Sequence, residues 1–312
     1  MTEAARQARF ARTPRTPSTI ALAGSVDPAA LRAADWQLRG VLGTDPYLDR
    51  RDAVTYVEPS EVLADGALDA VAVDGEDRDL AALLPELRGS GLLLFLPTAA
   101  PLEPDLIRAA RGVPEAADAA VGLVARWEPW AQVVAAALPL AGGPPVQATV
   151  RGWPRGRQAA AELVDLVAAW CGEVVAVAAS PAPLPAGELP GGAAVAWTLL
   201  TASGATVLVS HDGPAPLVRL SFATARLEAG PAGVRWEGGA ELPLPLATRW
   251  VPDGVHPGLV ATAAALGAAT GGRDVPATVW PWPADLGDLL VVARVLEALR
   301  TSARTEQLVP VA

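Results

Sequence analysis

In the first 125 residues, short apolar runs alternate with segments whose apolar positions recur at helical spacing. Such alternation is typical of parallel βαβ units, in which strands are buried on both faces. The runs expected to be strands are 18–24, 37–42, 52–57, 69–73 and 92–96. The segments expected to be helical begin near 27, 58, 80 and 105. The pattern predicts a Rossmann-like domain over residues 18–125.

After residue 125 the pattern changes to longer alternating strands, which together predict an open, largely antiparallel sheet. The expected strands are 146–153, 173–179, 194–201, 206–210, 217–229 and 234–237. One amphipathic helix is expected at 158–171, and a C-terminal helix at about 285–304. The fold class is therefore α/β, with an α+β domain at 126–312 following the Rossmann-like domain.

Composition narrows the class of partner. The formal charge of −10 argues against nucleic acid and against anionic membrane surfaces. The basic residues of segment 1–17 lie among Thr and Pro, so that segment is expected to be a disordered tail. The start of the chain lacks the apolar core of a signal peptide, and apolar runs fall short of the ~18 residues of a membrane span, so a cytoplasmic protein is expected.

The residues available for chemistry are few. All 24 basic residues are arginine, and the two histidines are His211 and His256. His211, at a strand end before a turn, is expected at the surface. Cys171 is the one cysteine, which excludes internal disulfides, and these spacings predict no metal site.

The turn after the first predicted strand reads Gly24-Ser25-Val26-Asp27-Pro28. Val26 places a branched side chain where a pyrophosphate would approach, and Asp27 before Pro28 is typical of a capped helix start. A carboxylate there would occupy the amides that a phosphate needs. Asp74, Glu76 and Asp77 add negative charge after the fourth strand. These features argue against standard dinucleotide binding.

Segments spread over nearly the whole chain resemble the Gfo/Idh/MocA family of nicotinamide-dependent sugar and polyol oxidoreductases. The run 92–104, with Pro97, resembles the family's Glu-Lys-Pro turn, and 120–129 resembles its Val-Gly-(aromatic)-Gln-Arg-Arg-Phe segment. The helix 158–172 resembles its Asp-x-x-x-His-x-x-Asp helix, and 302–305 its closing Ser-Ala-Arg-Thr. The resemblance implies NAD(P) as cofactor, with Gly24, Ser25 and Pro97 at cofactor-binding positions.

The same resemblance places different residues at the family's catalytic positions. Leu96 stands at the lysine, and Gln158 and Glu162 stand at the aspartate and histidine. Glu162 and Asp165 are three residues apart, hence on one side of their helix, and are the candidate acid and base. Mutual repulsion and apolar surroundings would raise the pKa of Glu162. The expected substrate pocket consists of Arg126, Trp127, Glu128, Trp153 and Gln158.

The leading hypothesis is a catalytically degenerate member of the family without a cofactor. It would bind a small-molecule ligand or act as a scaffold, as a homo-oligomer or as the partner of a catalytic subunit. Leu217, Leu220, Val234 and Trp236 are expected to bury the uncovered face of the sheet on oligomerisation. One alternative is an NAD(P)-dependent oxidoreductase with a rebuilt site that uses Glu162. Another is a non-redox isomerase or lyase on the same fold.

Overall fold

The computed structural model describes the chain in segments that form two compact units. The first unit consists of Met1–Val124 with Arg249–Leu290, and the second of Ala125–Thr248 with Val291–Ala312. The described residues are 18–23, 28–42, 53–73, 81, 83, 87, 90–98, 103–113, 119–181, 194–238, 257–270 and 284–312.

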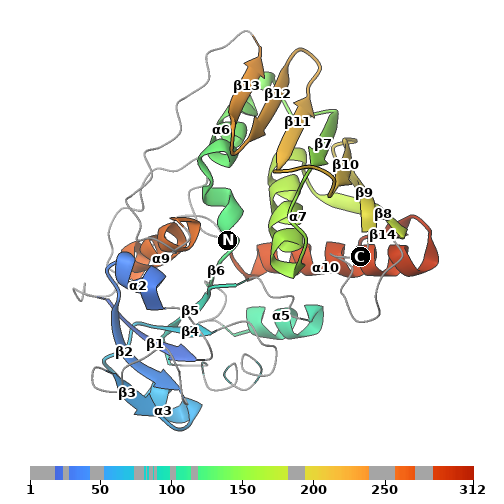
Figure 1. The fold of residues 1–312 in the computed structure, drawn as a ribbon. Coiled ribbons are helices and arrows are strands. Elements are labelled where there is room, and N and C mark those ends of the chain that lie inside the picture. Colours follow the sequence, from blue (N-terminus) through green and yellow to red (C-terminus); the bar gives the residue numbers. More distant parts are fainter. Residues whose placement is uncertain are drawn as a thin grey trace. The chain divides into compact units, whose positions relative to one another are not determined.

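The first unit contains a six-stranded parallel sheet in the order β3-β2-β1-β4-β5-β6 (Figure 1). Its order is that of a Rossmann fold, as predicted. Proline at the first helical position begins each of its short helices. The strands are β1 (Thr19–Ala23), β2 (Gln37–Leu42), β3 (Val54–Tyr56), β4 (Ala70–Val73), β5 (Leu93–Leu96) and β6 (Ala120–Val121). The helices are α2 (Pro28–Ala33), α3 (Pro59–Ala64), α5 (Pro104–Arg111) and α9 (Pro257–Thr270).

Helix α9 belongs to the first unit, although the sequence pattern assigned its residues to the second domain. Val260, Ala263 and Leu266 pack into one core with α2 and with Ile20 of β1. The indole N–H of Trp36 also donates a hydrogen bond to the carbonyl oxygen of Ala263, at 2.8 Å. Burial of this apolar helix against the parallel sheet explains the difference.

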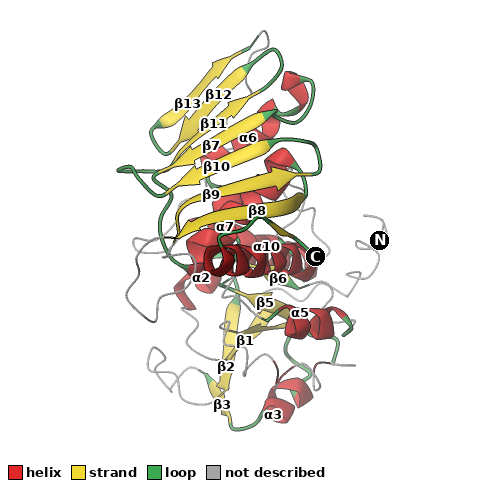
Figure 2. Cartoon of the chain, turned by 90° about the vertical axis from the view of Figure 1, so that its right-hand side faces the viewer, coloured by secondary structure: helices red, strands yellow, loops and turns green. Residues whose placement is uncertain are grey.

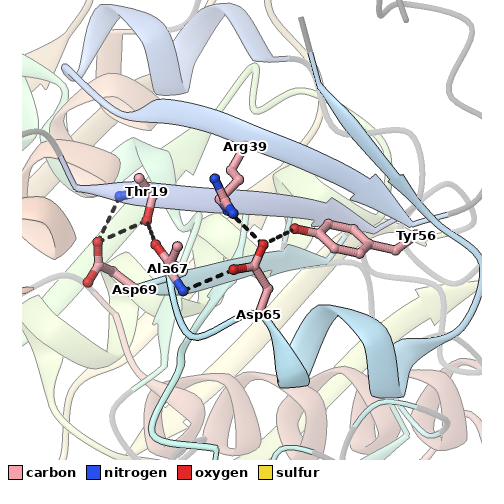
Figure 3. A network of polar contacts seen from close by, with 6 residues as sticks. All are labelled: Thr19, Arg39, Tyr56, Asp65, Ala67 and Asp69. Atoms are coloured by element: carbon pink, nitrogen blue, oxygen red, sulfur yellow. Dashed lines mark hydrogen bonds and ion pairs between the residues drawn. The ribbon is translucent and has the colours of Figure 1, made fainter.

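A polar network joins β1, β2 and β3 to the turn between α3 and β4 (Figure 3). Arg39 Nε and the hydroxyl of Tyr56 donate to the same carboxylate oxygen of Asp65, at 2.6 and 2.7 Å. The Asp65 carboxylate also accepts from the amide of Ala67 at 2.9 Å. Hydrogen bonding to Arg39 lowers the pKa of Asp65 to about 2, while burial, with the Asp65 hydrogen bond, raises that of Tyr56 to about 12. The turn after α3 is thereby tied to β2 and β3.

The second unit contains an eight-stranded sheet in the order β13-β12-β11-β7-β10-β9-β8-β14 (Figure 2). Its described strands pair antiparallel except for β7 with β10, so the prediction of a largely antiparallel sheet is confirmed. The strands are β7 (Gln147–Arg151), β8 (Val174–Pro181), β9 (Ala194–Thr201), β10 (Thr206–Ser210), β11 (Leu217–Ser221), β12 (Arg226–Gly230), β13 (Gly233–Glu237) and β14 (Val309–Pro310). The described helices are α6 (Pro129–Ala137), α7 (Arg157–Cys171) and, from Val291 onward, α10 (Leu286–Thr305), and 3₁₀ turns lie at Val124–Trp127 and Pro139–Ala141.

The expectation that four apolar residues share the uncovered face of this sheet is wrong. Leu220 pairs with Leu227, which pairs with Trp236, and both leucines are buried on the helix-covered face. Val234 pairs with the buried Ala229 on the same face, while Leu217 points to the other face. Successive strand residues alternate between faces, so Leu217 and Leu220, three apart, fall on opposite sides.

The expected single strand at 217–229 is a hairpin of β11 and β12. The amide of Phe222 donates to the carbonyl oxygen of Ala225 at 2.9 Å, which closes a tight turn with Ala223 and Thr224 exposed. The strands on either side pair antiparallel, Ser221 opposite Arg226. This turn lacks the Gly, Pro, Asn or Asp that normally marks one, so the apolar alternation appears uninterrupted.

Near its end, helix α10 makes two side-chain hydrogen bonds within the second unit. The hydroxyl of Ser302, fully buried, accepts from the amide of Ala179 at 2.9 Å and donates to the carbonyl oxygen of Gln307 at 2.5 Å. Strand β14 pairs with β8 only as far as Val177. The amide of Ala179, further along β8, therefore has the hydroxyl of Ser302 as its acceptor. Across the described ranges, no helix combines the length and apolar character that crossing a membrane demands.

Candidate functional site

The turn after β5, which the sequence likens to the Glu-Lys-Pro turn, packs closely against Gly122, the residue after β6. Gly122 donates its amide to the carbonyl oxygen of Leu96 at 2.7 Å. A side chain on Gly122 would place its Cβ 2.0 Å from the oxygen of Pro97, so only glycine fits there. Leu96 and Phe95 are buried, at 0% and 1% exposure. The position that the resemblance assigns to a lysine is therefore an apolar core side chain.

The expected dinucleotide turn lies outside the described residues. Gly24 and Ser25 belong to it, together with Val26 and Asp27, and the acidic run 74–77 lies outside as well. His256 is likewise outside. Of the three expected cofactor-binding residues, Pro97 is described, directly after β5.

Asp165 is engaged in a buried ion pair with Arg126. Arg126 Nε and a terminal guanidinium nitrogen contact the two carboxylate oxygens at 2.6 and 2.5 Å. Both residues are buried, at 8% and 3% exposure. Such a two-pronged pair fixes orientation as well as charge. It ties the 3₁₀ turn before α6 to the middle of α7, and both oxygens of Asp165 are used by it.

Glu162 has a different neighbour from the one expected. Its Oε1 accepts a hydrogen bond from the side-chain amide of Gln158 at 2.7 Å, one turn earlier on α7. Both side chains are half-buried. The structure thus brings together Gln158 and Glu162 as one pair, and Arg126 and Asp165 as another. The role of Glu162 and Asp165 as acid and base stays a prediction.

Three tryptophans form a buried cluster beside these pairs. The ring of Trp130 lies edge-to-face with those of Trp153 and Trp170, with centroids 6.3 and 5.9 Å apart. All three are at most 7% exposed, so they pack the layer between the helices and the sheet. Trp127 and Glu128, from the expected pocket, are half-buried at the start of α6.

His211 is the residue that sequence reasoning placed wrongly. It is half-buried, and its Nδ1 lies 3.0 Å from the carbonyl oxygen of Trp153. Its ring packs edge-to-face against Trp197, with centroids 5.2 Å apart. The Asp-Gly-Pro sequence after His211 is typical of an exposed turn, and it led to the prediction of an exposed side chain. The sequence does not show that Trp197 and Trp153 from other parts of the sheet pack against the ring.

The remaining described candidates are the Cys171 thiol and side chains that could bind a metal. Burial raises the pKa of the Cys171 thiol to about 12, which makes it a poor nucleophile at neutral pH. Within the described ranges, no cluster of three or more His, Cys, Asp or Glu side chains has the arrangement of a metal site. The described site thus consists of the Gln158–Glu162 pair on α7 and the buried Arg126–Asp165 ion pair, which joins α7 to the 3₁₀ turn.

Comparison with known proteins is informative at the level of structure. An oxidoreductase of Agrobacterium radiobacter, solved with NAD+, L-tartaric acid and magnesium, matches 95% of this chain and 99% of its own at a TM-score of 0.69 and 18% identity. The WlbA dehydrogenase of Bordetella pertussis, solved with NADH and UDP-GlcNAcA, matches 96% and 99% at 0.68 and 16%. A myo-inositol dehydrogenase of Corynebacterium glutamicum matches 95% and 99% at 0.64 and 15%.

The chain has the fold of the Gfo/Idh/MocA-type oxidoreductases. The match extends over nearly the full length of both partners, and at these identities it establishes the fold. No protein-family model matches the sequence. No curated protein matches it either.

Proposed function

We propose that this protein is a ligand-binding or scaffolding protein built on the oxidoreductase fold, without the standard hydride-transfer chemistry. The observation that carries the proposal is the set of side chains at the catalytic positions implied by the resemblance. Leu96 has no exchangeable proton and is fully buried, and Gln158 does not titrate. Glu162 is hydrogen-bonded by Gln158. A proton relay between a lysine, an aspartate and a histidine has no counterpart in these residues.

The pair of Gln158 and Glu162 supports ligand binding. An amide and a carboxylate together offer hydrogen-bond donors and acceptors to a polar small molecule. The Arg126–Asp165 pair holds the 3₁₀ turn, and with it Trp127, to the same helix. The ligand expected is therefore a small polar molecule, held by hydrogen bonds at the start of α7.

Assembly is part of the same proposal. The uncovered face of the second sheet carries Leu208 at 42% exposure and the half-buried Leu200, among threonine and arginine side chains. An open sheet with apolar residues on its outer face favours association, as a homo-oligomer or with a catalytic subunit. Light scattering at micromolar concentration is expected to give a mass above that of one chain, and a monomer would contradict this.

The retained-cofactor test addresses the enzymatic alternative. Native mass spectrometry of the gently purified protein is expected to show the chain without NAD(H) or NADP(H). A co-purifying dinucleotide, together with turnover that collapses in Glu162→Gln while the fold stays intact, would establish the oxidoreductase with a rebuilt site instead. Since Glu162→Gln retains the shape of the side chain, a loss of about 10²-fold or more would report proton transfer.

A further inference from the structure

Two hydrogen bonds connect the loop after β10 to the first turn of α7. The indole N–H of Trp153 donates to the carbonyl oxygen of Ala159 at 2.7 Å, and His211 Nδ1 lies 3.0 Å from the carbonyl oxygen of Trp153. Because a carbonyl only accepts, His211 must donate its Nδ1–H. Ala159 lies between Gln158 and Glu162, the pair on which the proposed ligand site rests.

The first turn of α7 begins after Gly156, at φ 117°, which has no side chain with which to cap it. The indole of Trp153, 4% exposed, contacts this turn through its hydrogen bond to the Ala159 carbonyl oxygen. Its own position is fixed by the edge-to-face contact with Trp130.

The position of His211 is equally constrained. The carbonyl of Ala215 packs so closely on Gly152, at φ +63°, that a Cβ on Gly152 would lie 2.3 Å from the Ala215 oxygen. The loop that follows His211 is thus pressed against the residue before Trp153. Trp197, 2% exposed, forms the wall on which the imidazole ring rests.

We propose that His211 is a positioning residue for the Gln158–Glu162 pair, acting through Trp153 on the first turn of α7. The proposal rests on the proposed function only in taking that pair as the ligand site. The Trp153 carbonyl oxygen can only accept, so Nδ1 carries the hydrogen in this contact. His211 therefore acts as a fixed donor and transfers no proton itself.

Two substitutions separate this role from proton transfer and from simple packing. His211→Asn places an amide N–H near the position of Nδ1 and cannot titrate, whereas His211→Phe keeps the ring and removes the donor. In the full chain, hydrogen exchange of the amides in the first two turns of α7 is expected to be faster by about three- to tenfold in His211→Phe, as for a lost hydrogen bond. His211→Asn is expected to restore wild-type exchange, and the last turn before Cys171 serves as the internal control.

A spectroscopic readout follows the site itself. In protein labelled with ¹³C at glutamate carboxyl carbons, Glu162 is identified as the signal missing from Glu162→Gln. Its titration curve is expected to shift in His211→Phe and to match wild type in His211→Asn. Should His211→Phe not fold, His211→Gln, whose amide falls near Nε2 instead, provides the same test. The proposal would be overturned if His211→Phe gave the exchange rates and the Glu162 titration curve of the wild type. It would also be overturned if His211→Asn changed them as much as His211→Phe does while the sheet amides remain protected. These readouts need neither ligand nor dinucleotide, so a failure of the proposed function would be seen separately.

Discussion

At the scale of single residues, the two carboxylates of α7 differ in what holds them. Asp165 neutralises a buried guanidinium, whereas Glu162 is half-buried and hydrogen-bonded to a neutral amide. Asp165→Asn is expected to destabilise the fold by about 3–5 kcal/mol, because it leaves the charge of Arg126 buried without its carboxylate. Glu162→Gln keeps an acceptor for Gln158 and is expected to stay within about 0.5 kcal/mol. Denaturant unfolding of both variants measures the contrast, and equal losses would contradict it.

Asp65 gives a residue-scale prediction about pH. Its pKa is about 2 in the fold, against about 4 when unfolded, so its contribution to stability is present above pH ~4 and fades as pH falls towards 2. Asp65→Asn is therefore expected to lower the melting temperature at pH 7, with a gap to wild type that narrows towards pH 2. Asp105→Asn, which removes an exposed carboxylate on α5, is the control. A gap independent of pH would show that Asp65 is not held ionised.

At the scale of elements, Ser302 links α10 to the edge of the second sheet. Removing its hydroxyl leaves the buried amide of Ala179 and the carbonyl of Gln307 without this partner. Ser302→Ala is expected to lower the free energy of unfolding by about 1–3 kcal/mol. Thr305→Ala, at an exposed position of the same helix, is the control. If Ser302→Ala lowered the free energy of unfolding no more than Thr305→Ala does, water would be replacing the hydrogen bonds of the Ser302 hydroxyl.

Elements also show what the sequence predicts and where it fails. The predicted strands 37–42 and 194–201 coincide with β2 and β9, because strands buried on one or both faces leave a local pattern. The turn at Ala223 and Thr224 leaves none, since an unstrained tight turn accepts ordinary residues. The sequence also did not predict which residues of β11 and β13 share a face. The uncovered face is set by pairing across strands, which placed Val234 and Trp236 under the helices.

The sequence indicated which residues lie on or beside α7, but not which of their side chains contact one another. Motif positions identified Arg126, Gln158, Glu162 and Asp165, all of which the structure places on or beside α7. That Arg126 takes Asp165 as its partner depends on how the 3₁₀ turn packs against the helix, 39 residues away along the chain. The link from His211 through Trp153 depends on the parallel pairing of β7 with β10.

At the scale of the whole molecule, the fold is shared with oxidoreductases, whereas Leu96, Gln158 and Glu162 differ from the catalytic set that the resemblance implies. The assignment of α9 to the first unit illustrates the limit of local patterns. A helix that is apolar on nearly all sides reveals that it is buried, but its sequence does not reveal which sheet buries it. Likewise, a fold shared over nearly the full length does not carry its activity with it, because activity depends on particular side chains.

Calorimetric titration of the purified chain with NADH and with NADPH tests the central claim most directly. Leu96 is buried at the position that the resemblance gives to a lysine, and Val26-Asp27-Pro28 stands in the expected dinucleotide turn. No saturable heat is therefore expected up to about millimolar cofactor, a concentration that corresponds to a binding free energy of only ~4 kcal/mol. A saturable isotherm with a dissociation constant in the micromolar range would contradict it.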